Sequence, residues 1–572
     1  MENNQTAFDT RCLSSLAKVF PDAAPADRPF PAATALWKET YAFQVAYRSS
    51  RAIARMKISV QSELAPYVSV REVGLSPSEL PVLEDPDPGY LRTAPGLYPD
   101  PLYPLADAIR ALPGQWRSVW VTIALPSRAQ GEASLGGKTE GAIPIEVAFE
   151  DESGERLGSE TFSLSILPAE LPEQRLKHTE WFHADCIATQ YGVGAFSEEH
   201  WRLLERFIRN AVDHGVNMLL TPLFTPPLDT AVGGERPTVQ LIGVTRFGED
   251  DYRFDFGRLE RWVRMCREIG IRYFEFSHLF TQWGAKHAPK IMATVDGEEQ
   301  RIFGWETDAG SESYRRFLDR FLPELVRFIE KQGIGDVSYF HVSDEPSLEH
   351  LASYRQAREL LRRHLSAYRF FEALSDYAFY EQGLVPTPVP ATNHIEPFLE
   401  HDVEPLWTYY CVGQHRDVSN RFFSLPSARN RIIGFQLYKH GIQGFLHWGF
   451  NFWYTQYSLR SVDPFRVTDA GGAFPSGDAF VVYPGADGPI DSLRWEVFRE
   501  ALQDVRALEL LGSLRGRQAA LDALTEGLEK GQLTFSRYPG SAEWLLETRQ
   551  RVNLAIAAAV QDSDRTNSRN DA

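Results

Sequence analysis

The stretch "VSYFHVSDEP", residues 337–346, decides the fold that the sequence predicts. An apolar run is followed at once by two adjacent carboxylates, Asp344 and Glu345, and then by Pro346. Such a run is typical of a strand that is buried on both faces in a parallel sheet. The two acids then lie where the strand ends and before its helix begins. This is the edge at which α/β barrels carry their reactive residues.

The same strand-and-helix unit recurs on both sides of this stretch. Ser197 is expected to cap a helix that Gly215 ends, and a buried strand follows at 217–224. About eight such units fit between residues 178 and 515, which predicts an eight-fold β/α (TIM) barrel. A doubly wound open sheet is the alternative, but the sequence lacks the GxGxxG turn of a dinucleotide site.

The N-terminal third has a different pattern of apolar residues. Apolar and polar residues alternate there, as in "IPIEVAF" at 143–149, which indicates half-buried antiparallel strands and a β-sandwich. The segment "LPAELPEQ", residues 167–174, has the prolines and acids of a short stiff connector. The predicted multidomain order is a β-sandwich (1–172), the barrel (173–515), C-terminal helices packed on the barrel (516–560) and a disordered polar tail (561–572).

Composition limits the possible partners. The 572 residues carry a formal net charge of −18, which disfavours nonspecific binding to nucleic acid or anionic lipid. The four cysteines are far apart in sequence and form no zinc motif or disulfide framework.

No stretch approaches the ~20 apolar residues of a membrane span, and the N-terminus lacks a signal-peptide core. We therefore expect a cytoplasmic protein with no nucleic acid or membrane partner. The sequence does not indicate the oligomeric state.

Two adjacent carboxylates need a reason, because like charges close together repel and desolvation raises the cost. One explanation is purely structural, because acids are favoured near any helix N-terminus. Asp344 and Glu345 stand together at a barrel strand end, which favours catalysis instead. Neighbouring residues of a regular strand point to opposite faces, so at least one must lie beyond the strand for both to reach one ligand. One carboxyl would then protonate a leaving oxygen while the other addresses a group beside the reacting carbon.

The other predicted strand ends and loops suggest the substrate class. They carry aromatic side chains interspersed with a few carboxylates, amides and imidazoles, as in "HADC" (183–186), "SHLFTQWG" (277–284), "WTYYC" (407–411) and "LHWGFNFWYTQY" (446–457). A pyranose offers C–H faces for stacking and hydroxyls for hydrogen bonds, so these segments favour a sugar ligand. The histidines lack a second ligand at metal-binding spacing, and we expect neither a metal nor another cofactor.

Several long segments resemble the catalytic domain of glycoside hydrolase family 123, the β-N-acetylgalactosaminidases. They are "HVSDEPSLEHLASYRQAREL" (341–360), "LWTYYC" (406–411), "GFQLYKHGIQGFLHWGFNFW" (434–453), "DPF" (463–465), "GGAFPSGDAFVVYPG" (471–485) and "SLRWEVFREALQDVRALELL" (492–511). The resemblance implies a β-sandwich followed by a β/α barrel, and a retaining mechanism in which the 2-acetamido oxygen of the substrate attacks the anomeric carbon. Glu345 corresponds to the general acid/base, and Asp344 to the residue that orients the acetamido N–H. No separate protein nucleophile is then needed.

The resemblance implies an exo-enzyme that releases terminal β-N-acetylgalactosamine from an oligosaccharide or glycoconjugate. The hexosaminidases of family 20 also use an adjacent Asp-Glu pair, so a broader β-N-acetylhexosaminidase is one alternative. A noncatalytic sugar-binding barrel is another, although it would not need the pair. The predicted sugar contacts are Tyr410 to the acetamido oxygen, Trp448 or Trp453 as a wall, Asp185, His278 and Asn451 to hydroxyls, and Trp305 on a covering loop at 281–310.

Overall fold

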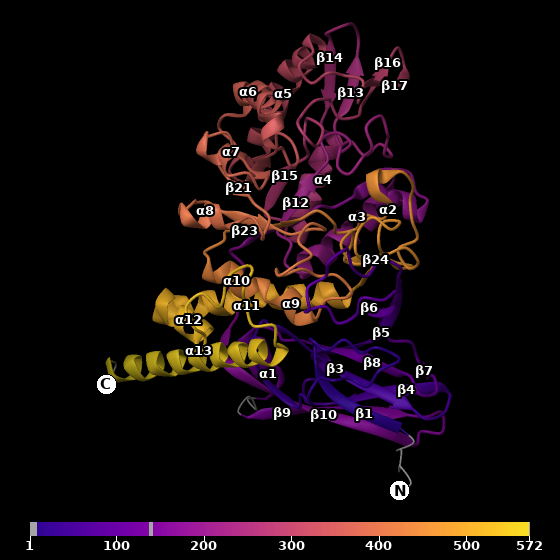
Figure 1. Ribbon diagram of the computed structural model, residues 1–572, viewed down its shortest axis with the longest axis vertical. Coiled ribbons are helices and arrows are strands. Elements are labelled where there is room, and N and C mark those ends of the chain that lie inside the picture. The colour runs from indigo at the N-terminus through magenta and orange to yellow at the C-terminus, as the bar shows by residue number, and fades with distance from the viewer. Residues whose placement is uncertain (1–7, 137–140, 571–572) are drawn as a thin grey trace. The chain divides into compact units, whose positions relative to one another are not determined.

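The computed structural model describes residues 8–136 and 141–570, and its elements are labelled in Figure 1. The chain divides into two compact units. Unit 1 comprises residues 1–175, 416–440 and 490–572, and unit 2 comprises residues 176–415 and 441–489.

Unit 1 contains a β-sandwich of two five-stranded sheets. Phe43 of one sheet stacks on Phe162 of the other, with ring centroids 4.3 Å apart, in a shared apolar core. The pairing is antiparallel except between β10 and β2, which are parallel. One sheet has the order β1 (Phe8–Ser14), β3 (Thr40–Ser49), β8 (Trp116–Ala124), β5 (Val68–Ser78), β6 (Gly96–Pro104), and the other β2 (Ala32–Trp37), β10 (Arg156–Glu170), β9 (Ala142–Glu150), β4 (Ile53–Gln61), β7 (Ile109–Ala111). The predicted alternation of buried residues therefore marks real strands.

The helices of unit 1 come from the C-terminal part of the chain, apart from α1 (Arg128–Ser134). They are α9 (Ser427–Arg431), α10 (Ile433–Lys439), α11 (Leu493–Arg515), α12 (Arg517–Thr525) and α13 (Ala542–Asn570). Helix α11 contacts the other four, and α13 contacts β2 and β10 of the sandwich. The sequence had instead placed residues up to 515 in the barrel and the later helices against it.

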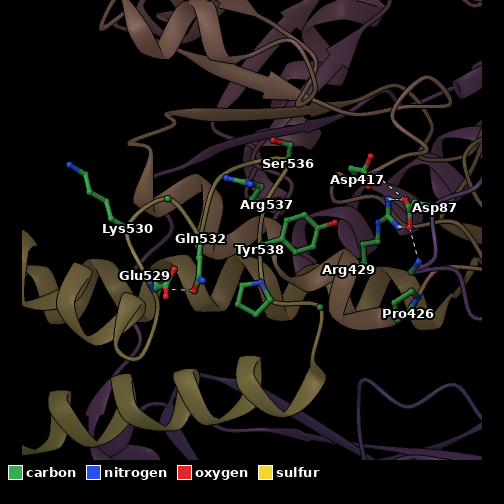
Figure 2. Close-up of a pocket in the computed structure, with 14 residues that line it drawn as sticks. Asp87, Asp417, Pro426, Arg429, Glu529, Lys530, Gln532, Ser536, Arg537 and Tyr538 are labelled. Atoms are coloured by element: carbon green, nitrogen blue, oxygen red, sulfur yellow. Dashed lines mark hydrogen bonds and ion pairs between the residues drawn. The ribbon is translucent and has the colours of Figure 1, made fainter.

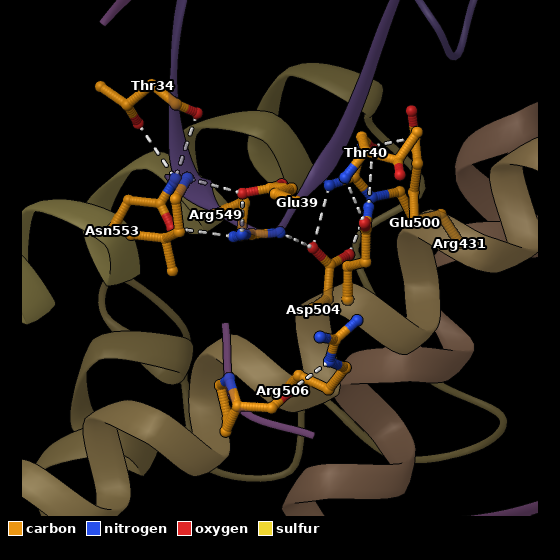
Figure 3. Close-up of polar contacts among 12 residues, drawn as sticks. Thr34, Glu39, Thr40, Arg431, Glu500, Asp504, Arg506, Arg549 and Asn553 are labelled. Carbon is orange, nitrogen blue, oxygen red and sulfur yellow. Dashed lines mark hydrogen bonds and ion pairs between the residues drawn. The ribbon is translucent and has the colours of Figure 1, made fainter. Parts of the chain in front are cut away.

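Buried ion pairs explain why these helices belong to the same unit as the sandwich (Figure 3). Arg549 of α13 donates to Glu39 of the sandwich and to Asp504 of α11, at 2.9 Å in each case. Asp504 also accepts from Arg431 of α9 at 2.7 Å. Removing one partner of such a buried group leaves an uncompensated charge, so the network ties the three segments together. Partners this distant in the sequence cannot be read from local periodicity.

The end of the chain also differs from its prediction. Helix α13 continues to Asn570, through most of the residues expected to form a disordered tail. Once its first turns are packed, extending a helix by one polar residue costs much less than starting one. Residues 571–572 of the predicted tail lie outside the described residues.

Unit 2 is built around a parallel sheet of seven strands. In order they are β19 (Arg369–Phe370), β18 (Ser338–Phe340), β15 (Tyr273–Phe276), β12 (Met218–Thr221), β11 (Lys177–Glu180), β23 (Gly444–His447) and β22 (Trp407–Tyr409). A second parallel pair follows β19 in sequence: β20 (Glu372–Ala373) and β21 (Pro388–Val389). The sheet itself is a half-barrel. Helices connect many of its strands, as expected from the alternation of predicted strands and helices along the sequence.

The connecting helices begin and end largely at predicted signals. Ser197 caps α3 by accepting from the His200 N–H, and Trp201 and Leu204 lie buried on the predicted face. The helices of unit 2 are α2 (Ala184–Tyr191), α3 (Glu198–Asp213), α4 (Gly257–Ile269), α5 (Glu312–Gln332), α6 (Leu351–Leu365), α7 (Ala378–Glu381) and α8 (Glu396–Glu400).

The predicted covering loop at 281–310 is not a simple loop. It contains a hairpin that joins a four-stranded sheet, in the order β14 (Tyr252–Asp255), β13 (Gly243–Arg246), β16 (Ile291–Val295) and β17 (Glu298–Phe303). The turn Asp296–Gly297 connects β16 to β17, with both residues in the left-handed region that such turns require. The short strands β24 (Val482–Pro484) and β25 (Pro489–Asp491) precede α11.

Candidate active site

The two adjacent carboxylates lie beyond the end of β18, as the sequence required. β18 ends at Phe340, and Glu345 adopts a left-handed backbone conformation with φ of 44°. This conformation breaks the strand alternation, so both side chains face one cavity. The Glu345 N–H donates to the Ala373 carbonyl at 3.1 Å, and the Asp344 carbonyl accepts from the Trp283 N–H at 3.0 Å. Neighbouring segments therefore hold the turn in its strained conformation.

Asp344 and Glu345 line a cavity of about 220 Å³ in unit 2. Its walls combine aromatic rings with a few acids and amides and include neither arginine nor lysine. The lining is Trp181, His183, Leu228, Asp229, Gln282, Trp283, Asp344, Glu345, Ala373, Tyr409, Cys411, Val412, Leu446, Trp448, Gln456, Tyr457 and Phe474. A cavity with this combination of apolar walls and convergent polar groups is typical of a small-molecule site.

The deep and outer parts of the cavity differ in exposure. Trp181 is 4% exposed and Tyr409 is 8% exposed, whereas Trp283 and Tyr457 are 38% and 39% exposed. The Trp283 and Tyr457 rings stand nearly perpendicular, with centroids 6.0 Å apart. These two rings therefore mark the mouth.

The pKa values of the two carboxyls are both raised. Asp344 is half-buried and Glu345 opens toward solvent, yet protein atoms crowd both carboxyl groups. Desolvation is the main cause of both pKa shifts, and the charge of Glu345 further raises the pKa of Asp344. The Tyr409 hydroxyl opposes the shift at Glu345 by donating to Oε1 at 2.6 Å. The carboxyls titrate as a pair, in which ionisation of one disfavours ionisation of the other.

Of the other predicted sugar contacts, Trp448 lies in the cavity wall. It is half-buried, and its indole N–H donates to Asp478 at 3.1 Å, which fixes the orientation of the ring. Either Trp448 or Trp453 is predicted to form the wall of a sugar site, and of the two it is Trp448 that lines the cavity.

Asp185 and Asn451 lie behind the wall and hold other residues. Asp185 forms a buried ion pair with Arg236 at 2.7 Å. The Asn451 side chain accepts from the His183 N–H and donates to the His183 carbonyl. These contacts occupy the groups that were expected to bind hydroxyls. His183 itself lines the cavity, and burial and the charge of Arg236 lower its pKa to about 3.

The remaining predicted contacts also lie elsewhere. Tyr410 packs in the interior against Phe445, whereas its neighbour Tyr409 faces the cavity. Trp453 is a core residue whose indole N–H donates to the Val482 carbonyl at 3.2 Å. Trp305 follows β17 and packs against His287. His278 is buried beneath the cavity, stacked on His341.

Several lining residues were not predicted from the sequence. Trp181 directly follows β11, Tyr409 occurs in the predicted strand-end segment 407–411, and Asp229 and Gln456 lie in connections. Only the strand register would have distinguished Tyr409 from Tyr410, because residues on both faces of such a strand are apolar.

One group of buried residues is close enough to suggest a metal site. Ring nitrogens of His278 and His341 and a carboxylate oxygen of Glu372 lie within 4.8 Å of one another. The two imidazole rings, however, are stacked 4.1 Å apart with planes only 20° from parallel. Lone pairs in two nearly parallel planes do not converge on one ion, so we assign no metal to this group.

Unit 1 has a larger cleft of about 810 Å³ (Figure 2). Residues 529–540 form one side, and Arg429, paired with Asp87 at 2.7 Å, lies on the other. The lining has no two adjacent acids and only one aromatic side chain, Tyr538. The smaller cavity in unit 2 therefore matches the predicted chemistry better than the larger cleft.

The region that carries this cavity matches a known protein family. Residues 181–511 match the family model described as glycoside hydrolase 123, catalytic domain. A solved family 123 glycoside hydrolase from Clostridium perfringens, studied for glycolipid glycan hydrolysis, has a similar fold: 14% identity and a TM-score of 0.73 over 98% of this chain and 100% of that one.

More distant structural matches include other glycosidases. A β-glucuronidase from Parabacteroides merdae has 11% identity and a TM-score of 0.31, covering 87% of this chain and 52% of that one. A family 5 mannosidase from Rhizomucor miehei has 10% identity and a TM-score of 0.33, covering 58% and 93%. No curated protein sequence matches the chain. Among the described helices, none has both the length and the apolar character needed to cross a membrane.

Proposed function

The chain belongs to glycoside hydrolase family 123, and from this membership we propose that it is a retaining exo-β-N-acetylgalactosaminidase that works by substrate assistance. The observation that carries the proposal is the placement of Asp344 and Glu345 on one cavity, with Tyr409 hydrogen-bonded to Glu345. The proposed substrate is the non-reducing end of an oligosaccharide or glycoconjugate glycan. The Clostridium perfringens relative, studied for glycolipid glycan hydrolysis, supports that class.

In the proposed first step, Glu345 gives its proton to the glycosidic oxygen as the bond from C1 to that oxygen breaks. The 2-acetamido oxygen of the same sugar attacks C1 from the opposite face and forms a cyclic oxazolinium. Asp344 accepts the acetamido N–H, which orients the group and stabilises positive charge developing on its nitrogen. In the second step Glu345 takes a proton from water, whose oxygen attacks C1 and reopens the ring. The two inversions give net retention.

The cavity size supports removal of one sugar at a time. Its volume of about 220 Å³ lies below the roughly 300–1,000 Å³ of pockets for drug-sized ligands, which suits a single pyranose. The faces of Trp181 and Trp448 supply apolar walls for such a ring. Tyr409, and not Tyr410, presents its hydroxyl to the cavity, where it donates its one hydrogen to Glu345.

Discrimination between galacto and gluco sugars needs a polar group against the hydroxyl at carbon 4. Asp185, His278 and Asn451 are directed elsewhere, so we propose Asp229 for this role. Its carboxylate is half-buried in the lining, and burial raises its pKa to about 6. Its Oδ2 accepts from the Tyr457 N–H at 2.9 Å, and the wrong epimer would leave the other carboxylate oxygen without a substrate hydroxyl, at a cost of about 1–3 kcal/mol.

We also propose that the parallel strands of unit 2 close into an eight-fold barrel. β19 and β20 are separated only by Phe371, and β20 pairs with β21. A parallel bridge from Ala391 to Tyr409 then connects the segment after β21 with β22, at the far edge of the seven-stranded sheet.

The decisive experiment compares kcat/KM for p-nitrophenyl β-N-acetylgalactosaminide and its N-acetylglucosaminide epimer, and follows the first anomer released by NMR. We expect the β-anomer first and at least tenfold poorer turnover of the gluco epimer, the factor given by ~1.4 kcal/mol. Comparable rates on both would favour the broader hexosaminidase. An α-anomer released first would exclude substrate assistance, and turnover of no glycoside would favour a sugar-binding protein.

A further inference from the structure

Three buried charged residues form a line beneath the catalytic pair. They are Glu275 of β15, His341 immediately after β18, and Glu372 of β20. The His341 ring lies between the two carboxylates, with Nε2 2.7 Å from Glu275 and Nδ1 3.1 Å from Glu372. Each of the three is at most 2% exposed. Charges are rarely buried to this extent without a function or a full set of partners.

Hydrogen bonding identifies the charge on His341. An ionised carboxylate can only accept, so both ring nitrogens must carry hydrogen to satisfy both neighbours. Burial opposes this charge, but the hydrogen bonds and charges of Glu275 and Glu372 raise the pKa of His341 to about 9. His278, stacked on the same ring, has its pKa lowered by burial and by the charge of His341. The stacked pair thus contains one imidazolium and one neutral ring.

Glu372 also holds the backbone that leads into the catalytic turn. Its Oε2 accepts from the N–H groups of Val342 at 2.9 Å and Ser343 at 3.3 Å, and from the Tyr354 hydroxyl at 2.7 Å. The next residue, Ala373, accepts from the Glu345 N–H. Residues 372 and 373 therefore fix the chain on both sides of Asp344.

Glu275 connects the same line to the cavity wall. It accepts from the Trp181 indole N–H at 2.7 Å and from the Thr179 hydroxyl. Trp181 lines the cavity, so the orientation of its ring depends on a carboxylate that also holds His341.

The charges around Asp344 are mostly negative. Burial and the charges of Glu345, Glu372 and Asp229 raise the pKa of Asp344 well above its ordinary value, and the charge of His341 opposes them. Without that cation the pKa of Asp344 would be higher still. Asp344 would then hold a proton under conditions in which the proton is needed on Glu345. Both carboxyls of the pair would then compete for the proton that must reach the leaving oxygen.

We propose that His341 is a positioning residue whose fixed positive charge opposes protonation of Asp344 and so favours the shared proton on Glu345. This inference rests on the proposed function, because it assigns the two protonation states that substrate assistance needs. His341 touches neither the cavity nor the substrate and acts through Asp344 and through Glu372. It acts as a permanent charge across the working pH range and not as a pH switch.

The test is the pH dependence of kcat/KM for p-nitrophenyl β-N-acetylgalactosaminide in His341→Gln and in the matched control His278→Gln. Each variant removes one ring of the stacked pair, but only the first removes a charge. In His341→Gln we expect the acidic limb of the kcat/KM profile to move to higher pH by about one unit. At pH values below the limb, kcat/KM should then fall by a further factor of about ten. The limb should stay in place in His278→Gln, whatever happens to the maximal rate.

A measurement on the wild-type enzyme covers the case in which His341→Gln does not fold. Nitrogen-15 NMR of labelled histidine should show both His341 nitrogens protonated at pH 7 and His278 neutral, and the carboxyl carbon of Asp344 should report an ionised group. A neutral His341, a protonated Asp344, or equal limb shifts in the two variants would overturn the inference. A wild-type enzyme that hydrolyses no N-acetylhexosaminide would instead overturn the proposed function, and the protonation states would still be measured.

Discussion

Replacing Tyr409 by phenylalanine removes the hydroxyl that is hydrogen-bonded to Glu345 of the proposed catalytic pair, and little else. That hydroxyl donates to Glu345 Oε1 at 2.6 Å, and the tyrosine is only 8% exposed. The bond favours the ionised form of Glu345 and so lowers its pKa. As the proposed general acid, Glu345 works only while protonated. The substitution should therefore extend activity to higher pH.

The size of the shift follows from the hydrogen bond that is lost. A hydrogen bond to a charged group contributes about 1.5–3 kcal/mol. One pKa unit corresponds to about 1.36 kcal/mol, so the pKa of Glu345 should rise by about 1–2 units. The alkaline limb of kcat/KM reports the acid in the free enzyme, and it should move upward by the same amount.

The assay is a pH profile of kcat/KM with Tyr409→Phe beside Tyr410→Phe. Tyr410 is the matched control, because it is the adjacent tyrosine and packs against Phe445 away from the cavity. Its variant should keep the wild-type limb. A limb that stays in place in Tyr409→Phe, or that moves to lower pH, would show that this hydroxyl does not stabilise the ionised acid.

Three further results are expected. Glu345→Gln should impair substrates with poor leaving groups far more than activated aryl glycosides, and equal losses would remove Glu345 from the acid role. Asp344→Asn should lower kcat by orders of magnitude with the fold intact, and an enzyme that hydrolysed 2-hydroxy glycosides as fast as 2-acetamido ones would argue against substrate assistance. Gly434→Ala should lower the free energy of unfolding by about 1–3 kcal/mol or more, because the new Cβ would lie 2.2 Å from the Ala501 carbonyl oxygen. Gly96→Ala, where nothing lies within 4 Å, is the control in urea unfolding, and equal effects would contradict the packing argument.

The turn that carries Asp344 and Glu345 was predictable because its signal is local. Two acids directly after an apolar strand and before a proline identify a strand end, and this signal does not depend on residues elsewhere in the chain. The requirement that one acid leave the strand was also predictable from the alternation of side chains, and the left-handed Glu345 meets it. The division of the chain was harder to predict. The sequence of α11 resembles one more barrel helix, and only the distant partners of Asp504, Arg431 and Arg549, place it in unit 1.

Two of the predicted sugar contacts lie away from the cavity lining for a related reason. Asp185 and Asn451 have the chemistry of hydroxyl ligands, but Arg236 and His183 already occupy them. A residue's chemical type does not reveal whether a distant partner uses it. Glu275 and Glu372, by contrast, did leave a signal, because each is a single acid inside an apolar strand segment, in "YFEF" and "RFFEAL". A buried charge is costly enough that such a position should itself be considered a candidate site residue.

Backbone strain around the cavity shows a further property of the site that the sequence does not reveal. Four lining residues that are not glycine have positive φ: Asp229 at 39°, Trp283 at 57°, Glu345 at 44° and Tyr457 at 61°. Each conformation costs on the order of 1–3 kcal/mol. Each of the four also donates its N–H across the rim: Tyr457 to the Asp229 carboxylate, Asp229 to the Gln282 side chain, Trp283 to the Asp344 carbonyl, and Glu345 to the Ala373 carbonyl.

These hydrogen bonds join five chain segments in sequence around the cavity, so that each strained turn is held by the next. A turn residue chosen for stability would be glycine or asparagine. The side chains found instead are Asp229 and Glu345, which the proposed chemistry uses, and the two aromatic rings at the mouth of the cavity. The cost of the strained backbone is therefore best explained by the positions it gives to those side chains, because the same turns would be more stable with glycine and would lose the site.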